Sequence, residues 1–276
     1  LVIITGIYGV VVYATLPASL SANRREMTRG QMLDALGALD RLGAARAAVL
    51  VDPRTAPAWF AERLRASGAR VLAEPDPVAL PKAIKNTVEQ AGARAAHRRD
   101  AVAVCRFLAW LERAAPAGGL TEIAAAERLR ALRAEGERFR GESFPAISGA
   151  GPNGAIIHYR VSEATNRPLA PGELYLIDSG AQYLDGTTDV TRTVLIGETA
   201  GELVEMRDRY TRVLKGHIAI ATLRWPRGVA GPHVETMARR ALWDVGLDYD
   251  HGTGHGVGSY LSVHEGPTGL SRAALP

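Results

Sequence analysis

Two aspartates and three histidines stand in segments where their side chains could bind a metal ion. Asp178 lies inside an apolar, strand-like stretch, and Asp189 begins a second such stretch 11 residues further on. Downstream, the glycine-rich segment HGTGHGVGSYLSVHEGP contributes His251, His255 and His264. Carboxylate and imidazole groups are ligands of divalent cations, so we expect these segments to meet around one or two metal ions.

The spacing of the two aspartates raises a geometric difficulty. Asp185-Gly186 is a strong signal for a two-residue turn, and that turn would place Asp189 opposite Gln182. Asp178 would then share a face with Asp189 but lie about 13 Å away, at roughly 3.3 Å per residue, whereas paired metal ions are about 3.5–4 Å apart. We therefore expect a bulge or a wider loop to bring Asp189 level with Asp178, and we interpret Asp185 as a turn residue rather than a ligand.

A pair of divalent ions at such a site would suit hydrolysis. Two ions can lower the pKa of a bridging water, hold hydroxide at neutral pH and polarise a carbonyl under attack. Carboxylates are suited to this because each can chelate one ion or bridge two. Taken alone, however, Asp178 is better interpreted as an acid at the end of a strand than as a ligand. In the same way, Asp189 is better interpreted as a turn residue.

Five longer blocks of the sequence carry a family pattern. They are GGLTEIAAAERL, GPNGAIIHY, YLIDSGAQYLDGTTDVTRT, VLKGHIA and LWDVGLDYDHGTGHGVGSYLSVHEGP, which lie within residues 118–267, and the similarity as a whole covers roughly residues 33–276. The chain thereby resembles the Xaa-Pro aminopeptidases (aminopeptidase P), which have the creatinase-like, or pita-bread, metallopeptidase fold. The later blocks are long enough to make a chance match implausible, so the resemblance reverses the interpretation of the two aspartates.

The resemblance assigns roles to six side chains. It implies three metal ligands, which are Asp178, Asp189 and His255. It places three groups around the substrate, which are His158, His251 and His264. Of these, His158 and His264 are implied in catalysis. Each of the two ends an apolar run, AIIH or LSVH, so we expect both rings on a strand face beside a cleft, where they can stabilise the tetrahedral intermediate.

The function implied is that of a metal-dependent aminopeptidase. It would release the N-terminal residue from peptides with proline in second position, through attack by a hydroxide that bridges two metal ions. An Xaa-Pro bond has no amide N–H and a fixed φ, so we expect an apolar pocket for the ring and acidic groups for the free amine. Two alternatives stay open: an Xaa-Pro dipeptidase of the same fold, and a non-catalytic pita-bread module that binds peptides or proteins. A homodimer is also left open.

The expected cofactor is a pair of divalent ions. Because oxygen ligands dominate and one imidazole joins them, Mn²⁺ is favoured, with Zn²⁺ or Co²⁺ as alternatives. The family places two glutamate ligands beyond its VHEGP segment, and they have no counterpart before Pro276. We therefore expect a C-terminally truncated catalytic domain that is inactive and binds metal weakly by itself.

The elements that position these residues predict an α+β catalytic domain preceded by part of a small α/β domain. Residues 1–31 form an unassigned apolar leader. Residues 32–81 read as helix, strand, helix and strand, with a helix end at Gly68, which is typical of a partial creatinase-type N-terminal domain. The proline-rich segment EPDPVALPK marks a boundary near residues 79–82. Residues 82–276 form the incomplete pita-bread domain.

Four helices are expected in the second domain. Asn86 or Thr87 caps the first, with Glu89 or Gln90 as reciprocal partner, and Thr121 caps the second. The other two cover residues 204–223 and 234–245. Because strands follow helices in each half, we expect a domain built from two similar halves.

The first twenty residues, LVIITGIYGVVVYATLPASL, carry no charge. Their length would just span a bilayer, but two glycines, Pro17 and many β-branched residues oppose a membrane helix, and no basic leader marks a signal peptide. Two buried strands, LVIIT and GVVVYAT, are favoured, with a membrane or export segment and a non-native leader as alternatives. Because Cys105 is the only cysteine, a cytoplasmic location is expected.

Composition argues against nucleic-acid binding. The net charge is +4 over 276 residues, but the arginines alternate with acids, as in AERLRALRAEGERFRGE. No basic stripe with interleaved aromatics is present. Cys105 lies in the apolar run AVAVCRFLAWL, so we expect a buried structural thiol.

Overall fold

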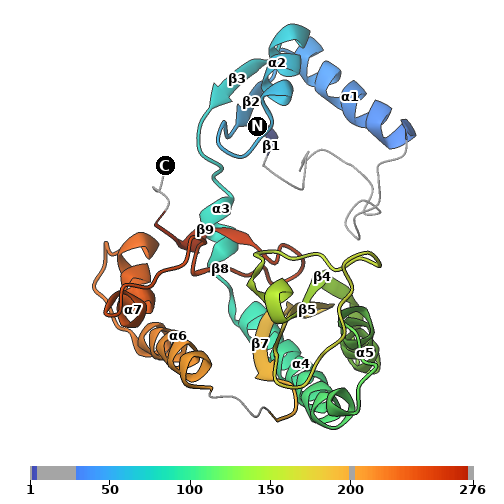
Figure 1. The fold of residues 1–276 in the computed structure, drawn as a ribbon. Coiled ribbons are helices and arrows are strands. Elements are labelled where there is room, and N and C mark those ends of the chain that lie inside the picture. The colour runs from blue at the N-terminus through green and yellow to red at the C-terminus, as the bar shows by residue number, and fades with distance from the viewer. Residues whose placement is uncertain (1, 5–28, 199–202, 273–276) are drawn as a thin grey trace. The chain divides into compact units, whose positions relative to one another are not determined.

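The computed structural model describes residues 2–4, 29–198 and 203–272. The chain divides into two compact units, Leu1–Ala79 and Leu80–Pro276 (Figure 1). Each unit is described by itself below.

The smaller unit is a three-stranded parallel sheet in the order β1-β2-β3. Its elements are β1 (Val2–Ile4), α1 (Arg29–Ala44), β2 (Ala48–Val51), α2 (Ala58–Ser67) and β3 (Arg70–Ala73). Leu39, Val49 and Leu64 are buried at its centre. Helix α2 ends at Gly68, as predicted, because φ of +103° there is a left-handed conformation that glycine adopts without strain.

The apolar leader is described only at its start. Val2–Ile4 forms strand β1, which pairs in parallel with β2, so the first of the two predicted strands is present. The second, GVVVYAT, lies outside the described residues. Among the residues that are described, no helix is both long and apolar enough to cross a membrane.

The larger unit contains two successions of helices followed by strands. The first comprises α3 (Ala79–Ala83), α4 (Thr87–Ala114), a 3₁₀ turn (Ala115–Ala117), α5 (Glu122–Ala134), β4 (Phe139–Ala150), a second 3₁₀ turn (Gly151–Ala155), β5 (Leu174–Tyr183), β6 (Gly186–Thr187) and β7 (Val190–Leu195). The second comprises α6 (Val204–Thr222), α7 (Gly231–Trp243), β8 (Gly254–Gly256) and β9 (Glu265–Leu270). This order agrees with the predicted two halves.

Predicted caps begin the first two long helices. Asn86 accepts a hydrogen bond from the Glu89 amide, and the Glu89 carboxylate accepts one from the Asn86 amide, both at 2.9 Å. Thr121 Oγ1 accepts from the Ala124 amide at the start of α5. These bonds satisfy amides that a helix leaves unpaired in its first turn, which fixes where each helix starts.

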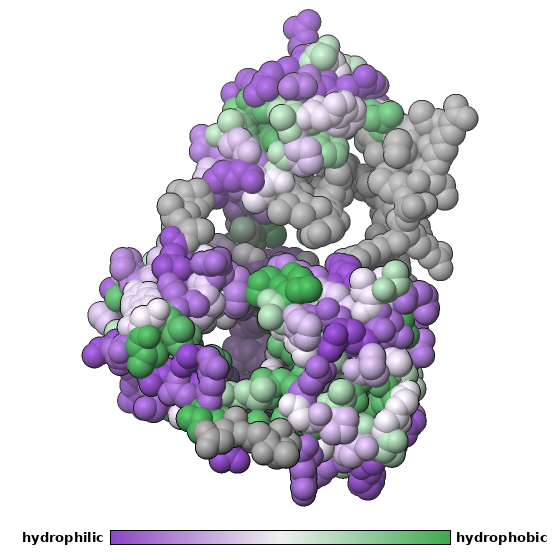
Figure 2. All heavy atoms as spheres, in the orientation of Figure 1, coloured by the Kyte–Doolittle hydropathy of each residue, from purple (hydrophilic) through white to green (hydrophobic). Residues whose placement is uncertain are grey.

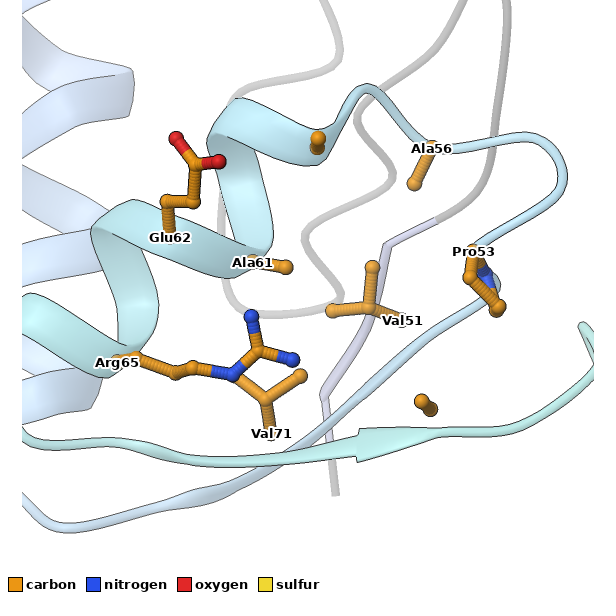
Figure 3. A pocket seen from close by; sticks show the side chains of 9 residues that line it. Val51, Pro53, Ala56, Ala61, Glu62, Arg65 and Val71 are labelled. Carbon is orange, nitrogen blue, oxygen red and sulfur yellow. The ribbon is translucent and has the colours of Figure 1, made fainter.

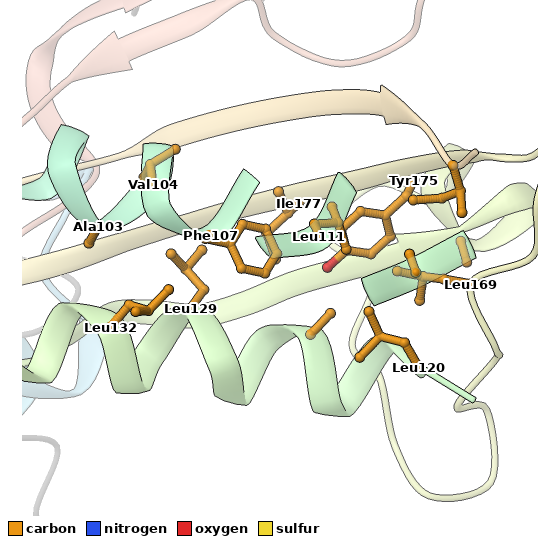
Figure 4. Packing of buried hydrophobic residues seen from close by; sticks show 14 residues of the cluster. Ala103, Val104, Phe107, Leu111, Leu120, Leu129, Leu132, Leu169, Tyr175 and Ile177 are labelled. Carbon is orange, nitrogen blue, oxygen red and sulfur yellow. The ribbon is translucent and has the colours of Figure 1, made fainter. Parts of the chain in front are cut away.

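Strand β5 is the centre of the first sheet and carries the site. It pairs antiparallel with β4 on one side and with β6 and β7 on the other. Alternate residues of β5, Tyr175 and Ile177, are buried against α4 and α5, where they meet Phe107 and Leu129 (Figure 4). Each such side chain contributes about 1.5–3 kcal/mol on burial. Asp178 has the opposite parity and faces away from this core.

Cys105 corrects one prediction. Its side chain is exposed rather than buried. Helix α4 buries the face that carries Val104, Phe107 and Leu111, and Cys105 lies outside that face. The apolar run in the sequence therefore covers more of the helix circumference than the core does.

Helices α6 and α7 pack closely in the second half. A Cβ on Gly216 would lie 2.1 Å from the Ala238 carbonyl oxygen, so only glycine permits this approach. On α6, Met206, Tyr210 and Val213 are exposed. Hydrophobic residues are visible among the hydrophilic ones over this helix pair (Figure 2). Within the described chain, that apolar face of α6 is left open to solvent.

Candidate metal centre

The hairpin that carries the two aspartates turns one residue earlier than predicted. Tyr183 pairs with Gly186, so the two-residue loop is Leu184-Asp185. Asp185 is a turn residue, as predicted, and its carboxylate pairs with arginines of α4 and of the segment before β4. The pairing then continues from β6 into β7 without a register shift.

This register removes the distance problem. Thr191 pairs with Asp178, so Asp189 falls across from Gly180, two residues from Asp178 along β5. Two residues correspond to about 6.6 Å along a strand, and the carboxyl groups of Asp178 and Asp189 are close enough to share a hydrogen bond. The predicted bulge or wider loop is therefore wrong, since a shift of the turn is sufficient.

The ladder opens locally beside Asp189. The Ala181 amide donates to Thr188 Oγ1 at 2.9 Å, and the Thr188 carbonyl accepts from Ser143 Oγ at 2.8 Å. A Cβ on Gly180 would lie only 2.0 Å from that carbonyl oxygen. Glycine in the sequence DSG therefore lets the strand that carries Asp189 close over β5.

His255 reaches the aspartates from the second sheet. It lies in β8, and its Nε2 is 3.3 Å from Asp189 Oδ2. Its Nδ1 is 2.9 Å from the Gly256 carbonyl oxygen. A carbonyl can only accept, so Nδ1 donates and Nε2 is the atom turned toward the carboxylate. A Cβ on Gly256 would lie 2.4 Å from the Glu265 carbonyl oxygen, so bare backbone is required beside the ring.

Two further histidines complete the cluster. The His264 ring lies edge-on to His255, with ring centroids 4.1 Å apart. The His158 ring lies 6.4 Å from His264. Five of the six predicted site residues are thus neighbours. The sixth, His251, stacks on Tyr249 at 4.7 Å instead.

His158 and His264 do not lie on strands, which corrects the expectation from AIIH and LSVH. His158 has a φ of +54°, and Leu261 and Ser262 have values of +61° and +53°. Such left-handed residues interrupt extended backbone. His264 directly precedes β9, and both rings therefore project from turns.

The turn before His264 is held by the first sheet. The Leu261 amide donates to Gln182 Oε1 at 2.9 Å, and Thr187 Oγ1 donates to the same oxygen at 2.7 Å. Gln182 and Thr187 are both buried. The histidine-bearing turn is therefore fixed to the hairpin that carries the aspartates.

Sequence reasoning missed Glu122, which holds the loop that carries His158. Its buried carboxylate accepts hydrogen bonds from the Ala150 amide at 2.7 Å, the Tyr159 hydroxyl at 3.1 Å and the Arg167 amide at 3.0 Å. Tyr159 is the neighbour of His158, whose left-handed backbone costs about 1–3 kcal/mol. The only sequence signal was the family block GGLTEIAAAERL, since an acid at the start of a helix is otherwise ordinary.

Thr191 was missed as well. Its Oγ1 donates to Asp178 Oδ1 at 2.8 Å, so it fixes the rotamer of that carboxylate. Glu265, next to His264, is buried and pairs with Lys82 and Lys85. Its carboxylate is therefore paired with two lysines, which makes it a poor general base.

The electrostatics favour a proton or a cation beside the two aspartates but not at His264. Burial raises the pKa of Asp178; Thr191 opposes this, and neighbouring Asp189 raises it further. The hydrogen bond to Asp189 raises the pKa of His255, against its burial. Burial and neighbouring His255 lower the pKa of His264. Like charges placed together stabilise a bound proton or cation between them.

Carboxylate and imidazole groups such as those of Asp178, Asp189 and His255 are suitable ligands for a divalent cation. Within the described ranges, no three His, Cys, Asp or Glu side chains stand as an open cage for an ion. Asp189 nevertheless contacts His255, and it is close enough to Asp178 to raise the pKa of that carboxyl. The Nδ1 bond of His255 to a carbonyl is the outer bond that metal-binding histidines make.

Two pockets of the described chain contain none of the clustered side chains. One of about 200 Å³ lies in the smaller unit, between Val51, Ala61 and Val71, with Glu62 and Arg65 at its edge (Figure 3). It contains no candidate site residue. A second depression of similar volume is lined by Leu174, Leu176 and Thr193 among others. It lies on the β5 face that carries Asp178.

Two successions of helices followed by antiparallel strands, as found in solved metallopeptidases of this fold, place the chain in the pita-bread class of proteins. The chain belongs to metallopeptidase family M24, whose model matches residues 91–275.

Individual relatives agree with this assignment. Xaa-Pro aminopeptidase 2 of Sus scrofa is 49% identical over 200 residues, which are 72% of this chain and 29% of that protein. X-prolyl aminopeptidase of Caenorhabditis elegans, a cytosolic enzyme with a di-nuclear active site, superposes with a TM-score of 0.73 at 37% identity. The superposition covers 88% of this chain and 39% of that structure.

A prolidase from Pyrococcus furiosus superposes with a TM-score of 0.70 over 85% of this chain and 66% of that structure. Its identity is 21%, which shows the shared fold alone. The chain thus spans 29% of the length of the Sus scrofa relative and 39% of the C. elegans structure.

Proposed function

We propose that this chain is part of a metal-dependent aminopeptidase that removes the N-terminal residue from peptides with proline in second position. The observation that carries the proposal is the approach of His255 Nε2 to within 3.3 Å of Asp189 Oδ2, with Asp178 beside Asp189 in the register of the hairpin. These side chains come from two separate sheets, and a structural role gives no reason for two partly buried acids to adjoin. Similarity to Xaa-Pro aminopeptidases supports the substrate class.

Asp178, Asp189 and His255 would hold two divalent ions. When bound, such ions supply Lewis-acid activation of water and of the scissile carbonyl. Thr191 keeps the Asp178 carboxylate in one rotamer, and the Gly256 carbonyl keeps Nε2 of His255 turned inward. Mn²⁺ is the ion we propose, because two of the three donors are carboxylates.

His158 and His264 would act on the substrate rather than on the metal. Both rings stand at the margin of the cluster, within reach of a carbonyl placed against it. A ring N–H can donate to the oxygen on which negative charge develops, and this interaction strengthens in the transition state. His251 has the weakest claim, because its ring packs on Tyr249.

The second depression is the surface we propose for the apolar part of the substrate. Leu176 precedes Asp178 by two residues on the same face of β5 and lines the second depression. A pyrrolidine ring carries no N–H to satisfy, so an apolar wall beside the aspartates suits it.

The two alternatives have less support. An Xaa-Pro dipeptidase rests on fold alone, since the prolidase match is 21% identical. A non-catalytic module would have lost ligands, whereas Asp178, Asp189 and His255 are all present. The cytosolic relative supports a cytosolic location. The homodimer stays a prediction that sedimentation of the full-length protein would test.

The test is a peptidase assay on the full-length protein. We expect it to release the first residue of Xaa-Pro dipeptides, tripeptides and longer peptides, to lose this activity after chelation and to regain it best with Mn²⁺. Peptides with alanine in second position serve as the control. Cleavage of dipeptides alone would establish the dipeptidase, and full activity after chelation would overturn the proposal.

A further inference from the structure

Two carboxylate–guanidinium pairs are buried in the larger unit. The first joins Asp100 of α4 to Arg133 of α5, and each side chain is 1% exposed. Two parallel bonds of 2.7 and 3.0 Å link them. The Tyr183 hydroxyl also donates to Asp100 at 3.1 Å, and Arg133 donates to the Ser179 carbonyl at 3.4 Å. Both of these partners lie on β5, and Ser179 adjoins Asp178.

The second pair lies within α7. Glu235 and Arg239 are 0% and 1% exposed, and their closest atoms are 2.7 Å apart. The Thr253 hydroxyl donates to Glu235 at 3.0 Å. Arg239 donates to the His251 carbonyl at 2.6 Å and to the Tyr249 carbonyl at 2.5 Å. These partners lie in the segment that leads into β8 and His255.

The two pairs thus share one arrangement. In each pair, the carboxylate accepts a hydrogen bond from a hydroxyl of the segment that bears a proposed ligand. The guanidinium donates a hydrogen bond to a backbone carbonyl of the same segment. Among the described residues, these are the ion pairs in which both side chains are at most 1% exposed.

Stability alone does not account for such pairs. Removing two charges from water costs several kcal/mol per ion, and apolar residues of similar volume often stabilise a protein equally well. The second pair is also incompletely satisfied, because Glu235 Oε2 is buried without a hydrogen-bond partner. The guanidinium has a different advantage, since its fixed fork of N–H donors can hold several acceptors in one geometry.

We propose that Asp100–Arg133 and Glu235–Arg239 are positioning residues, each of which fixes the backbone of one ligand-bearing segment. The first pair holds β5 at Asp178, and the second holds the segment before His255. The inference rests on the proposed function for the role of those two ligands. Each pair acts through a hydroxyl and a backbone carbonyl of its segment.

Arg133→Lys and Arg239→Lys test the proposal in the full-length protein. Lysine keeps the charge beside the carboxylate but has no planar fork to span the other acceptors. Arg106→Lys and Arg240→Lys are matched controls, because each alters an exposed ion pair. Arg106 joins α4 to Glu135 at the end of α5, and Arg240 of α7 pairs with Asp244 at the end of that helix. The measurements are Mn²⁺ affinity and hydrogen exchange of backbone amides.

We expect each buried-site variant to bind Mn²⁺ about 10- to 100-fold more weakly, the usual effect of losing an outer partner of a ligand. Amide hydrogen exchange should rise in residues 249–256 for Arg239→Lys and in residues 176–180 for Arg133→Lys. In each variant, exchange in the other segment should stay as in the wild type. Both controls should match the wild type. Exchange that rises throughout the unit, or that stays unchanged, would overturn the proposal.

Two milder variants apply if a lysine variant does not fold. Tyr183→Phe and Thr253→Val each remove the hydroxyl that joins a ligand-bearing segment to the carboxylate, and we expect the same local exchange with a smaller change in Mn²⁺ affinity. Unchanged exchange in both would also overturn the proposal. If the wild type binds no Mn²⁺, the proposed function fails, while the exchange pattern still decides whether the pairs position these segments.

Discussion

Asp189 and His255 contact each other across two sheets, with Oδ2 and Nε2 3.3 Å apart. Asp189 follows the two-residue strand β6, and His255 lies in β8, and the described ladders do not join their sheets. The contact is therefore made by side chains at the place where the two halves meet. Asp189 also adjoins Asp178, so it is the residue through which the whole cluster is connected.

Asp189→Asn should abolish turnover and weaken metal binding in the full-length protein. The neutral amide keeps the shape of the side chain but cannot bridge two cations. Asp185→Asn is the matched control, because Asp185 is paired with arginines outside the cluster. Metal content and peptidase activity are measured after dialysis against chelator and reconstitution. A fully active Asp189→Asn protein would contradict the metal hypothesis.

Replacement of His158 or His264 with alanine should lower kcat by about 10²-fold or more while metal content stays nearly unchanged. This follows if the rings stabilise the transition state without ligating metal. Asp178→Ala provides the comparison, since it should lose metal. Metal loss in the histidine variants equal to that of Asp178→Ala would show that these rings are ligands.

Gly180→Ala should weaken metal binding although the residue carries no side chain. A methyl group there would meet the Thr188 carbonyl at 2.0 Å, and the strand that carries Asp189 would have to move. Overpacking of this kind costs about 1–3 kcal/mol of stability. Gly37→Ala in helix α1, where the nearest atom is the end of a flexible arginine, should be neutral or stabilising. Equal Mn²⁺ affinity in Gly180→Ala and wild type would refute the geometric argument.

The smaller unit should lose stability as the pH falls below about 4. Burial would raise the pKa of the Asp52 carboxyl, but amides of Asp76 and Arg54 and the Arg54 guanidinium lower it below its ordinary value. A folded-state pKa below the unfolded value stabilises the fold above the unfolded pKa, and this stabilisation is lost as the carboxylate takes up a proton.

Asp52→Asn should flatten that pH dependence, whereas Asp40→Asn, which alters an exposed pair in the same unit, should leave it intact. Hydrogen exchange of the β2 amides between pH 5 and pH 3 reports the stability of this unit. Identical slopes for Asp52→Asn and wild type would show that Asp52 does not govern acid unfolding here.

The sequence was informative where chemistry and local signals agree. Helix caps at Asn86 and Thr121 are local hydrogen-bond patterns, and both are confirmed. The residue types of Asp178, Asp189 and His255 suggested a metal site and the family resemblance grouped them, whereas their spacing did not; the structure brings them together. Their roles as ligands stay predictions.

The hairpin register could not be predicted, because distant contacts decide it. A Cβ on Gly92 of α4 would lie 2.2 Å from the Asp185 carbonyl oxygen, and one on Gly186 would lie 2.7 Å from Ala96. The turn is thus fitted against α4, where Arg99 also pairs with Asp185. Tertiary packing overrides the preference of Asp-Gly for the centre of a turn.

Apolar runs misled in the same way. AIIH and LSVH have strand-like composition, but left-handed residues and side-chain bonds such as that from Leu261 to Gln182 make turns of them. Cys105 lies in an apolar helical run yet faces solvent. The turns depend on partners far along the chain, and the exposure of Cys105 depends on which face of α4 the core covers, so a pattern read over neighbouring residues contains no information about either.

The hydrogen bond between Gln182 and Leu261 has a consequence for the order in which parts of the chain can fold during synthesis. The two residues are 79 positions apart, and synthesis at about 5–20 residues per second takes roughly 4–16 s to cover that length. A β-hairpin forms in about 1–10 μs, so the hairpin that carries the aspartates has time to form before the histidine segment leaves the ribosome. During that interval Asp178 and Asp189 lack His255, and a nascent chain would carry two adjoining acids with no imidazole beside them.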